Sequence, residues 1–233
     1  MWFYSADSMI TYIIIVLPAV FFAMWASHNV NSTYKKYAKV ATNCGLTADQ
    51  VVRRILDSNG LQNVAIERIA GELTDHYDPK ANVIRLSDSV YGNRSAAAIG
   101  VAAHEAGHAV QHAVGYFPIK VRMAIIPVCN IGSTLAMPLV LLGIILSNYA
   151  LANVGIFAFA LATVFQLVTL PVEFNASHRA IRALRAGGYL SEEELRGAKN
   201  VLDAAALTYV ASAISALLQL MRLLLIARRN DRD

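Results

Sequence analysis

Two histidines and a glutamate lie close together near the middle of this sequence and could bind and use a metal ion. His104 and His108 are four residues apart in a proline-free run, residues 95–114, that is rich in alanine. Residues at this spacing share one face of a helix, so both imidazoles can reach a single Zn²⁺ ion. Glu105, next to His104, can accept a proton from water bound to that ion. The spacing therefore predicts metal-assisted hydrolysis.

The surroundings of this H-E-x-x-H pattern favour the metal interpretation. The other positions of the run are nearly all Ala, Val, Ile and Gly, which suit burial. The alternative is a polar stripe on an amphipathic helix, but buried His and Glu are costly unless they are paired or metal-bound. The pattern is also typical of zinc peptidases. His112 shares the stripe, but it lies two turns beyond His104, so we expect it to flank the site or face solvent.

A catalytic zinc site needs three protein ligands, so a third must come from elsewhere in the chain. The candidates are His76, His112, Glu173 and His178. We favour Glu173, because it ends a long apolar segment, where an unpaired carboxylate is costly. The alternative is that Glu173 only marks a membrane boundary or pairs with Arg179.

The composition of the chain predicts a membrane protein. Hydrophobic residues make up 56% of the 233 residues and charged residues only 15%, unlike a typical soluble enzyme. The formal charge is +4, and arginines beside apolar segments favour membrane lipid as a partner. No nucleic-acid-binding motif is present, so no nucleic acid is expected as a partner. Cys44 and Cys129 lie in a polar and an apolar segment, which predicts neither a disulfide nor a cysteine metal site.

Long apolar segments organise the chain. Residues 9–26 predict a transmembrane anchor, residues 123–146 and 150–172 a transmembrane hairpin, and residues 204–226 a further segment that either spans or lies against the others. We expect a mostly α integral membrane protein with about four membrane helices and a small α+β zincin-like metallopeptidase domain. The expected parts are the anchor (1–28), the zincin-like domain with the H-E-x-x-H helix (29–117), the hairpin (118–172), the third-ligand helix and a following helix (173–203), and a C-terminal apolar helix with a basic tail (204–233).

A strand is expected over residues 82–87, because β-branched residues gather there. Only a short connection, residues 88–94, separates it from the H-E-x-x-H run. We expect a free edge of this strand to lie beside the metal and to bind an extended peptide through main-chain hydrogen bonds. The alternative is an internal strand in which Ile84 belongs to the core.

Four stretches of the chain resemble a family, the neutral zinc metallopeptidases of bacterial membranes. They are residues 74–79 (TDHYDP), 101–112 (VAAHEAGHAVQH), 169–177 (TLPVEFNAS) and 204–210 (AAALTYV). More distantly, the sequence is similar to membrane gluzincins of the CAAX-processing and heat-shock type. The resemblance implies Zn²⁺ as cofactor, with His104, His108 and Glu173 as ligands and Glu105 as general base. Ser177 stands where those relatives carry an aspartate, and it could orient one of the histidines more weakly than a carboxylate would.

These features predict a membrane-bound, zinc-dependent endopeptidase that hydrolyses peptide or protein substrates with metal-activated water. The oxyanion donor is open among His76, Tyr77, His178, Arg179 and Tyr209, and we favour His178 as a second catalytic residue. Two alternatives remain: a site-2-type intramembrane protease, and a non-enzymatic membrane protein with a structural metal.

Basic residues near the membrane ends predict the orientation. The side that carries the H-E-x-x-H run has eight of them: Lys35, Lys36, Lys39, Lys120, Arg122, Arg179, Arg182 and Arg185. The connection at residues 147–149 has none. Because Lys and Arg are enriched on the cytoplasmic side, we expect the catalytic domain in the cytoplasm. The arginines at the C-terminal end disagree if residues 204–226 span, and we follow the larger group.

Overall fold

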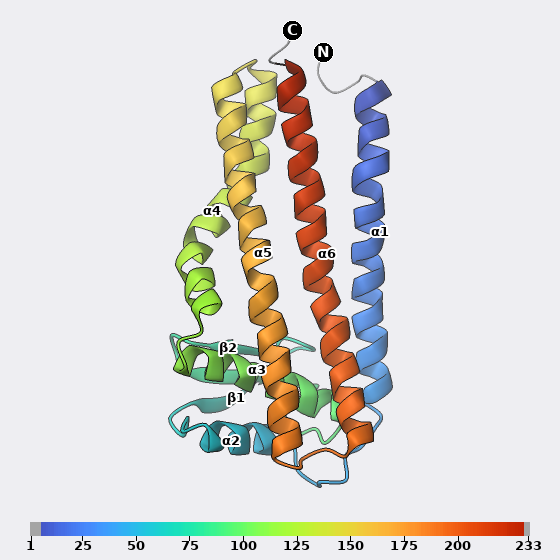
Figure 1. The fold of residues 1–233 in the computed structure, drawn as a ribbon, viewed down its shortest axis with the longest axis vertical. Coiled ribbons are helices and arrows are strands. Elements are labelled where there is room, and N and C mark those ends of the chain that lie inside the picture. Colours follow the sequence, from blue (N-terminus) through green and yellow to red (C-terminus); the bar gives the residue numbers. More distant parts are fainter. Residues whose placement is uncertain (1–5, 231–233) are drawn as a thin grey trace. The chain divides into compact units, whose positions relative to one another are not determined.

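The computed structural model describes the backbone of residues 6–230 and the side chains of residues 13–227, apart from 15 and 226. This part of the chain is mostly helical and includes a small sheet (Figure 1), which confirms the mostly helical character and the small sheet of the predicted class. The elements are α1 (Ala6–Tyr37), α2 (Ala48–Ser58), β1 (Ala65–Ile69), β2 (His76–Asp78), β3 (Val83–Ser87), α3 (Ala96–Ala113), α4 (Phe117–Ile145), α5 (Tyr149–Ala186) and α6 (Glu192–Asn230).

The chain forms two compact units. The first, which we call the mixed unit, consists of His28–Lys120 and Pro171–Leu207 and contains the whole sheet. The second, the helical unit, consists of Val121–Leu170 and the described parts of Met1–Ser27 and Thr208–Asp233. Four helices, α1, α4, α5 and α6, contribute residues to both units.

Helix α2 forms one wall of the core of the mixed unit. The Thr47 backbone N–H donates to the Gln50 side-chain oxygen (3.1 Å), which satisfies one free donor at the start of the helix. Apolar residues recur at helical spacing on its inner face, and Val51, Val52, Ile55 and Leu56 are all buried. This face packs against α3, so α2 supports the H-E-x-x-H helix from one side.

The three strands form one sheet in the order β1-β3-β2. β3 pairs in parallel with β1, where Ile66 lies opposite Ile84. It pairs in antiparallel with β2, where Tyr77 lies opposite Ile84. Both Ile84 and Leu86 of β3 are fully buried and belong to the core.

The strand predicted at residues 82–87 is present as β3, but the prediction that it has a free edge is wrong. β3 is the central strand, and neighbours occupy both of its edges. The alternative, in which Ile84 belongs to the core, is the one observed. The neighbours were hard to predict because β1 is mostly exposed and β2 has only three residues. The edge strands of the described sheet are β1 and β2.

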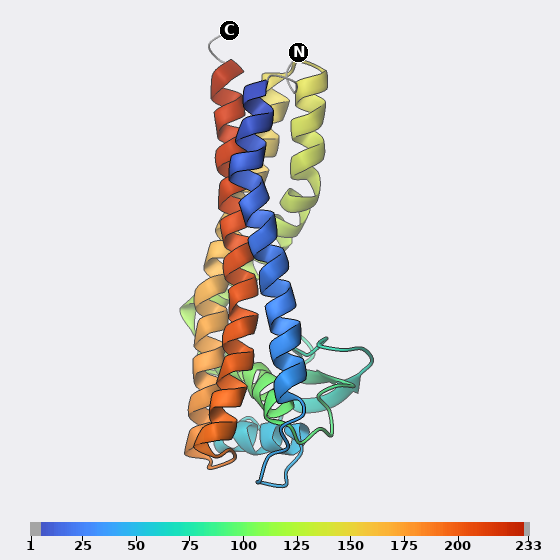
Figure 2. The same ribbon diagram turned by 90° about the vertical axis from the view of Figure 1, so that its right-hand side faces the viewer.

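Helix α3 is built from small residues that permit close packing on several sides. The Ser95 side chain caps its start by accepting a hydrogen bond from the Ala98 N–H (3.2 Å). At Gly107 the helix approaches α5 so closely that a Cβ atom would lie 2.6 Å from the Ala176 carbonyl oxygen. In Figure 2 the sheet lies on one side of α3 and the end of α5 on the other.

The helical unit contains long apolar stretches of α4, α5 and α6. By length and composition, three described helices can cross a membrane: Phe117–Ile145, Tyr149–Ala186 and Glu192–Leu225. α4 and α5 form the predicted hairpin and pack tightly, since a Cβ at Gly155 would lie 2.7 Å from the Ala136 carbonyl oxygen. Close contact at small residues is a common way for membrane helices to associate.

The predicted anchor at residues 9–26 lies within α1. Several of its side chains, those of residues 9–12 and 15, fall outside the described residues. A fourth membrane helix therefore stays a prediction, next to the three candidate spans found among the described residues.

Candidate metal centre

Two helices of the mixed unit bring together three side chains that could hold a metal ion. The ligand atoms of His104, His108 and Glu173 all lie within 4.8 Å of one another. Glu173 Oε2 is 3.2 Å from His104 Nε2 and 3.6 Å from His108 Nε2. Glu173 is only 2% exposed, so its carboxylate is shielded from water. Buried carboxylates need a partner of opposite charge or a metal ion.

The donor set and its spacing fit Zn²⁺. Two His nitrogens and one carboxylate oxygen are a usual ligand set of catalytic zinc. Atoms about 2.1 Å from an ion in tetrahedral geometry lie about 3.4 Å apart, and the two distances here are 3.2 and 3.6 Å. Within the described residues, no fourth His, Cys, Asp or Glu joins the group. A fourth position of the ion would therefore be left for water or substrate.

Each histidine is also held at its other ring nitrogen. His104 Nδ1 is 3.1 Å from the Ser177 hydroxyl, and His108 Nδ1 is 3.0 Å from the Gln111 side-chain oxygen. Ser177 lies one turn beyond Glu173 on α5. Such partners orient the ring and fix which nitrogen faces the metal.

Glu105 lies on the side of α3 that faces the sheet. Its side chain is largely buried, with 8% of the residue exposed. Its Oε2 atom accepts a hydrogen bond from the backbone N–H of Tyr77 in β2 (3.0 Å). The Tyr77 ring packs edge-on against His112, with 5.5 Å between ring centroids. The edge strand β2 and Glu105 of the H-E-x-x-H pattern are thus directly connected.

Burial and negative charge set the electrostatics around the group. Burial lowers the pKa of His108, but the close approach of Glu173 (3.6 Å) and the charges of Glu105 and Glu173 outweigh this, and the pKa is raised on balance. Burial raises the pKa of Asp75, hydrogen bonds from Ser87 oppose the shift, and the charge of Glu105 adds to it. The surroundings of His108 therefore favour a positive charge, which suits a cation.

Of the four candidates for the third ligand, the structure brings only Glu173 to His104 and His108. His76 lies in β2, where its Nδ1 is 2.9 Å from the Thr74 carbonyl oxygen. His112 packs against Tyr77 instead, and burial lowers its pKa, as does the nearby His108.

The structure does not bring His178, our favoured oxyanion donor, to this group. Its side chain is exposed, and its Nε2 is 2.8 Å from the Arg182 guanidinium. It lies five residues after Glu173, which is about 140° around a helix. Arg179 donates to the Asn175 side-chain oxygen (2.7 Å), and Tyr209 belongs to the part of α6 in the helical unit. Among the candidate donors, Tyr77 donates its backbone N–H to Glu105.

Sequence reasoning missed two polar side chains next to the group, Gln111 and Asn175. Gln111 is fully buried and contacts both His108 and α5. Its position three residues after His108 places it on the same helix face. That spacing, together with the cost of burying an amide without partners, was a usable signal.

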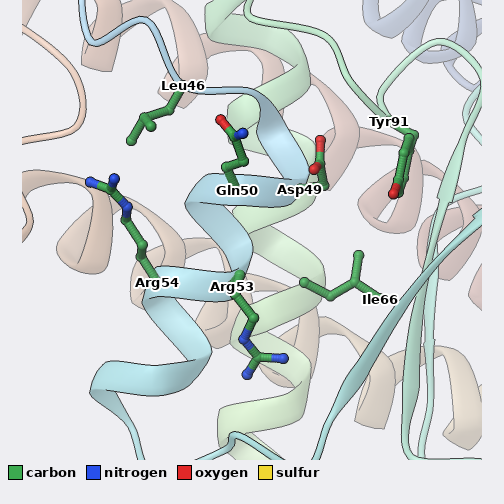
Figure 3. Close-up of a pocket in the computed structure, with 7 residues that line it drawn as sticks. All are labelled: Leu46, Asp49, Gln50, Arg53, Arg54, Ile66 and Tyr91. Carbon is green, nitrogen blue, oxygen red and sulfur yellow. The ribbon is translucent and has the colours of Figure 1, made fainter.

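Two cavities of the mixed unit are not lined by His104, Glu105, His108 or Glu173. The first, of about 450 Å³, is lined by Leu46, Asp49, Gln50, Arg53, Arg54, Ile66 and Tyr91 (Figure 3). Its Arg53 donates to the carbonyls of Leu61 and Val64 and to Asp57, so this side chain ties α2 to the chain that follows it. The second, of about 420 Å³, lies between α2, α3 and the end of α5.

Comparison with known proteins places these observations in context. The model of the family described as "Putative neutral zinc metallopeptidase" matches residues 12–228. The chain is also similar to the "Putative membrane protease YugP" of Bacillus subtilis (strain 168), with 46% identity over 222 residues. The alignment covers 95% of this chain and 98% of that protein. No solved structure matches.

Proposed function

Because this chain belongs to the family of putative neutral zinc metallopeptidases, we propose that it is a membrane-bound, zinc-dependent endopeptidase. The observation that carries the proposal is the group of His104, His108 and Glu173, with Glu105 adjacent on the same helix. The group offers three ligands within the described residues, whereas structural zinc sites are usually closed by four. This difference favours hydrolysis over a purely structural metal.

The proposed reaction assigns a separate task to each residue. His104, His108 and Glu173 would hold the ion, which lowers the pKa of a bound water to about 7 when present. Glu105 accepts the proton of the attacking water and returns it to the leaving amine as the peptide bond breaks. The hydrogen bond from the Tyr77 N–H holds one carboxylate oxygen of Glu105 in place during these transfers.

We further propose that the peptide substrate lies along β2. β2 is an edge strand, and in an antiparallel pair the residues alternate between facing the partner strand and facing outward. The Tyr77 N–H reaches Glu105 and therefore faces away from β3. The N–H and C=O of one residue face the same side of an antiparallel strand, so an extended peptide could add to this edge by donating to the Tyr77 carbonyl, while the Tyr77 N–H stays bound to Glu105. This replaces the role that we expected for residues 82–87.

A pair of variants tests the enzymatic function. We expect Glu105→Gln to retain zinc but to lower peptide hydrolysis about 10²- to 10⁴-fold, the usual range for a lost general base. We expect Glu173→Gln to lose both zinc and activity, since an amide is a much weaker ligand than a carboxylate. Metal analysis of the purified protein in detergent measures the zinc content, and a peptide-library cleavage assay measures hydrolysis. Glu67→Gln, at an exposed position of β1, is the control and should resemble the wild type. Full activity in Glu105→Gln would contradict the proposal.

We propose that the mixed unit faces the cytoplasm. The proposal rests on the basic residues near its membrane ends and on the enrichment of Lys and Arg on the cytoplasmic side. A protease-sensitive tag inserted after Asn59, an exposed residue that follows α2, should be protected in intact spheroplasts and digested after lysis. A second tag in the connection at residues 147–149 should be digested without lysis. Digestion of the first tag from outside would overturn this orientation.

A further inference from the structure

Gln111 is a fully buried amide that links His108 to helix α5. Its exposed fraction is 0%. Its side-chain oxygen is 3.0 Å from His108 Nδ1. Its side-chain nitrogen donates to the Val172 carbonyl oxygen (2.8 Å) and to the Asn175 side-chain oxygen (3.0 Å). All polar groups of this side chain are thus used, and Val172 directly precedes Glu173.

The partners of Gln111 fix which way its amide points. The Val172 carbonyl can only accept, so the amide nitrogen of Gln111 must face it. The Asn175 oxygen is fixed in turn, because it also accepts from Arg179 Nε–H (2.7 Å), which can only donate. The oxygen of Gln111 is therefore the atom that faces His108. Since that oxygen can only accept, His108 Nδ1 must carry the hydrogen.

We propose that Gln111 is a positioning residue that holds His108 in the Nδ1–H tautomer and so leaves its Nε2 lone pair free to bind the ion that Glu173 would also hold. The inference builds on the proposed zinc site. By bonding to Val172, the same side chain also ties His108 to the backbone that carries Glu173. One amide thus fixes two of the three ligands relative to each other.

The partner of the other histidine cannot do the same. His104 Nδ1 contacts the Ser177 hydroxyl, which can donate or accept. Ser177 can orient the ring but does not by itself decide which nitrogen is protonated. The contact of His108 with Gln111 therefore fixes the direction of its hydrogen bond, whereas the contact of His104 with Ser177 does not.

The first test reads the tautomer directly, in zinc-free protein. Nitrogen-15 NMR of histidine-labelled protein at alkaline pH should show His108 with its hydrogen on Nδ1. Gln111→Leu, which removes the donor and acceptor groups at similar size, should abolish that preference. A wild-type spectrum with the hydrogen on Nε2 would overturn the proposal. The wild-type spectrum tests the proposal even if Gln111→Leu does not fold.

The second test measures zinc affinity by competition with a chelator. Loss of a residue that orients a ligand typically weakens metal binding about 10- to 100-fold, and we expect this for Gln111→Leu. Asn175→Ala is the matched control, because it removes one acceptor but leaves the contacts of Gln111 with Val172 and His108. It should keep the tautomer and weaken zinc binding much less. Equal loss of affinity in both variants, or wild-type affinity in Gln111→Leu, would overturn the proposal.

The two tests separate this inference from the proposed function. A wild-type protein that binds no zinc but shows the Nδ1–H tautomer, lost in Gln111→Leu, would support the positioning role and contradict the peptidase. A wild-type protein that binds zinc and cleaves peptides, with no change of tautomer in Gln111→Leu, would contradict the positioning role alone.

Discussion

The two sides of α3 hold their functional groups in different ways. On the side that faces α5, side chains bind side chains: Glu173 contacts both histidines, and Ser177 and Gln111 contact their remaining nitrogens. On the side that faces the sheet, Glu105 is held by a backbone N–H of the edge strand β2. The first side is a closed network, and the second ends at a strand edge that a substrate could extend.

This difference matches the tasks proposed for the two sides. Metal ligands must keep a fixed geometry, and side-chain contacts with α5 provide it. A general base must reach both water and substrate, so its hydrogen-bond partner must leave part of the carboxylate accessible to them. A backbone donor from an edge strand meets this need, because the same strand can pair with a peptide. The comparison predicts that changes on the α5 side affect zinc, whereas changes on the sheet side affect turnover.

The largest effect is expected at Gly107, where α3 approaches α5. In Gly107→Ala the new Cβ would lie 2.6 Å from the Ala176 carbonyl oxygen, which is backbone and cannot rotate away. The helices must separate, which typically costs about 1–3 kcal/mol, and the histidines move away from Glu173. We expect reduced thermal stability and a large loss of zinc affinity.

The control for Gly107 is the same substitution at Gly100, about two turns earlier on α3. There the Cβ would meet the Ala198 Cβ of α6 at 3.0 Å, away from the three ligands. Gly100→Ala should destabilise the protein less and keep zinc affinity near that of the wild type. If Gly107→Ala keeps wild-type zinc affinity, close approach of the helices is not what sets the ligand geometry.

A smaller effect is expected at Tyr77, on the sheet side. Tyr77→Pro removes the N–H that binds Glu105, and proline is tolerated where an edge strand faces outward. A hydrogen bond to a charged group contributes about 1.5–3 kcal/mol, so turnover should fall about 10- to 100-fold while zinc is retained. Metal analysis and kinetics on the same preparation measure both.

Two further variants sharpen the test of β2. Tyr77→Phe keeps the backbone donor and loses only the hydroxyl that donates to Asn82 (3.1 Å), so its turnover should be close to wild type. Ile84→Pro changes the central strand β3 at a fully buried position, and we expect it to misfold and lose zinc. Loss of zinc in Tyr77→Pro would mean that the two sides of α3 are not separable.

How much of the fold and of the candidate site could be predicted from the sequence depends on how far apart in the sequence the contacting residues are. His104, Glu105 and His108 are recognisable because their relation is local, set by the spacing of one helix. Glu173 could be proposed because a carboxylate at the end of an apolar segment needs a partner. The long apolar segments of α4, α5 and α6 could likewise be recognised from the sequence as candidate membrane spans.

The remaining features depend on tertiary contacts that leave little trace in the sequence. β3 is the central strand of the sheet. The alternation of apolar and polar residues along one strand does not show which strands lie beside it. β2 has three residues, too few for a periodic pattern. His178 lies near Glu173 in sequence, but the turn of α5 exposes it beside Arg182. Proximity in sequence was therefore a poor guide to the oxyanion donor.

The smallest expected effect concerns Asp75, which precedes β2 on the sheet side. Its two carboxylate oxygens accept hydrogen bonds from the Ser87 N–H (2.8 Å) and hydroxyl (2.9 Å). Burial is the largest cause of its raised pKa, and the nearby charge of Glu105 adds to it. A raised pKa means that the folded protein binds the proton of Asp75 more tightly than the unfolded chain does.

The contribution of Asp75 to stability should therefore be fully present below its unfolded pKa of 3.8 and be lost as the pH rises through the raised folded value. Asp75→Asn keeps partners for both Ser87 groups, since its amide nitrogen can donate to the hydroxyl, but it cannot ionise. The melting temperature of the wild type should thus rise relative to this variant as the pH is lowered from neutral. Thermal unfolding at a series of pH values measures this difference, with the exposed Asp203→Asn as control. Parallel curves for the wild type and Asp75→Asn would show that the negative charge on this side of α3 carries no cost in the folded protein.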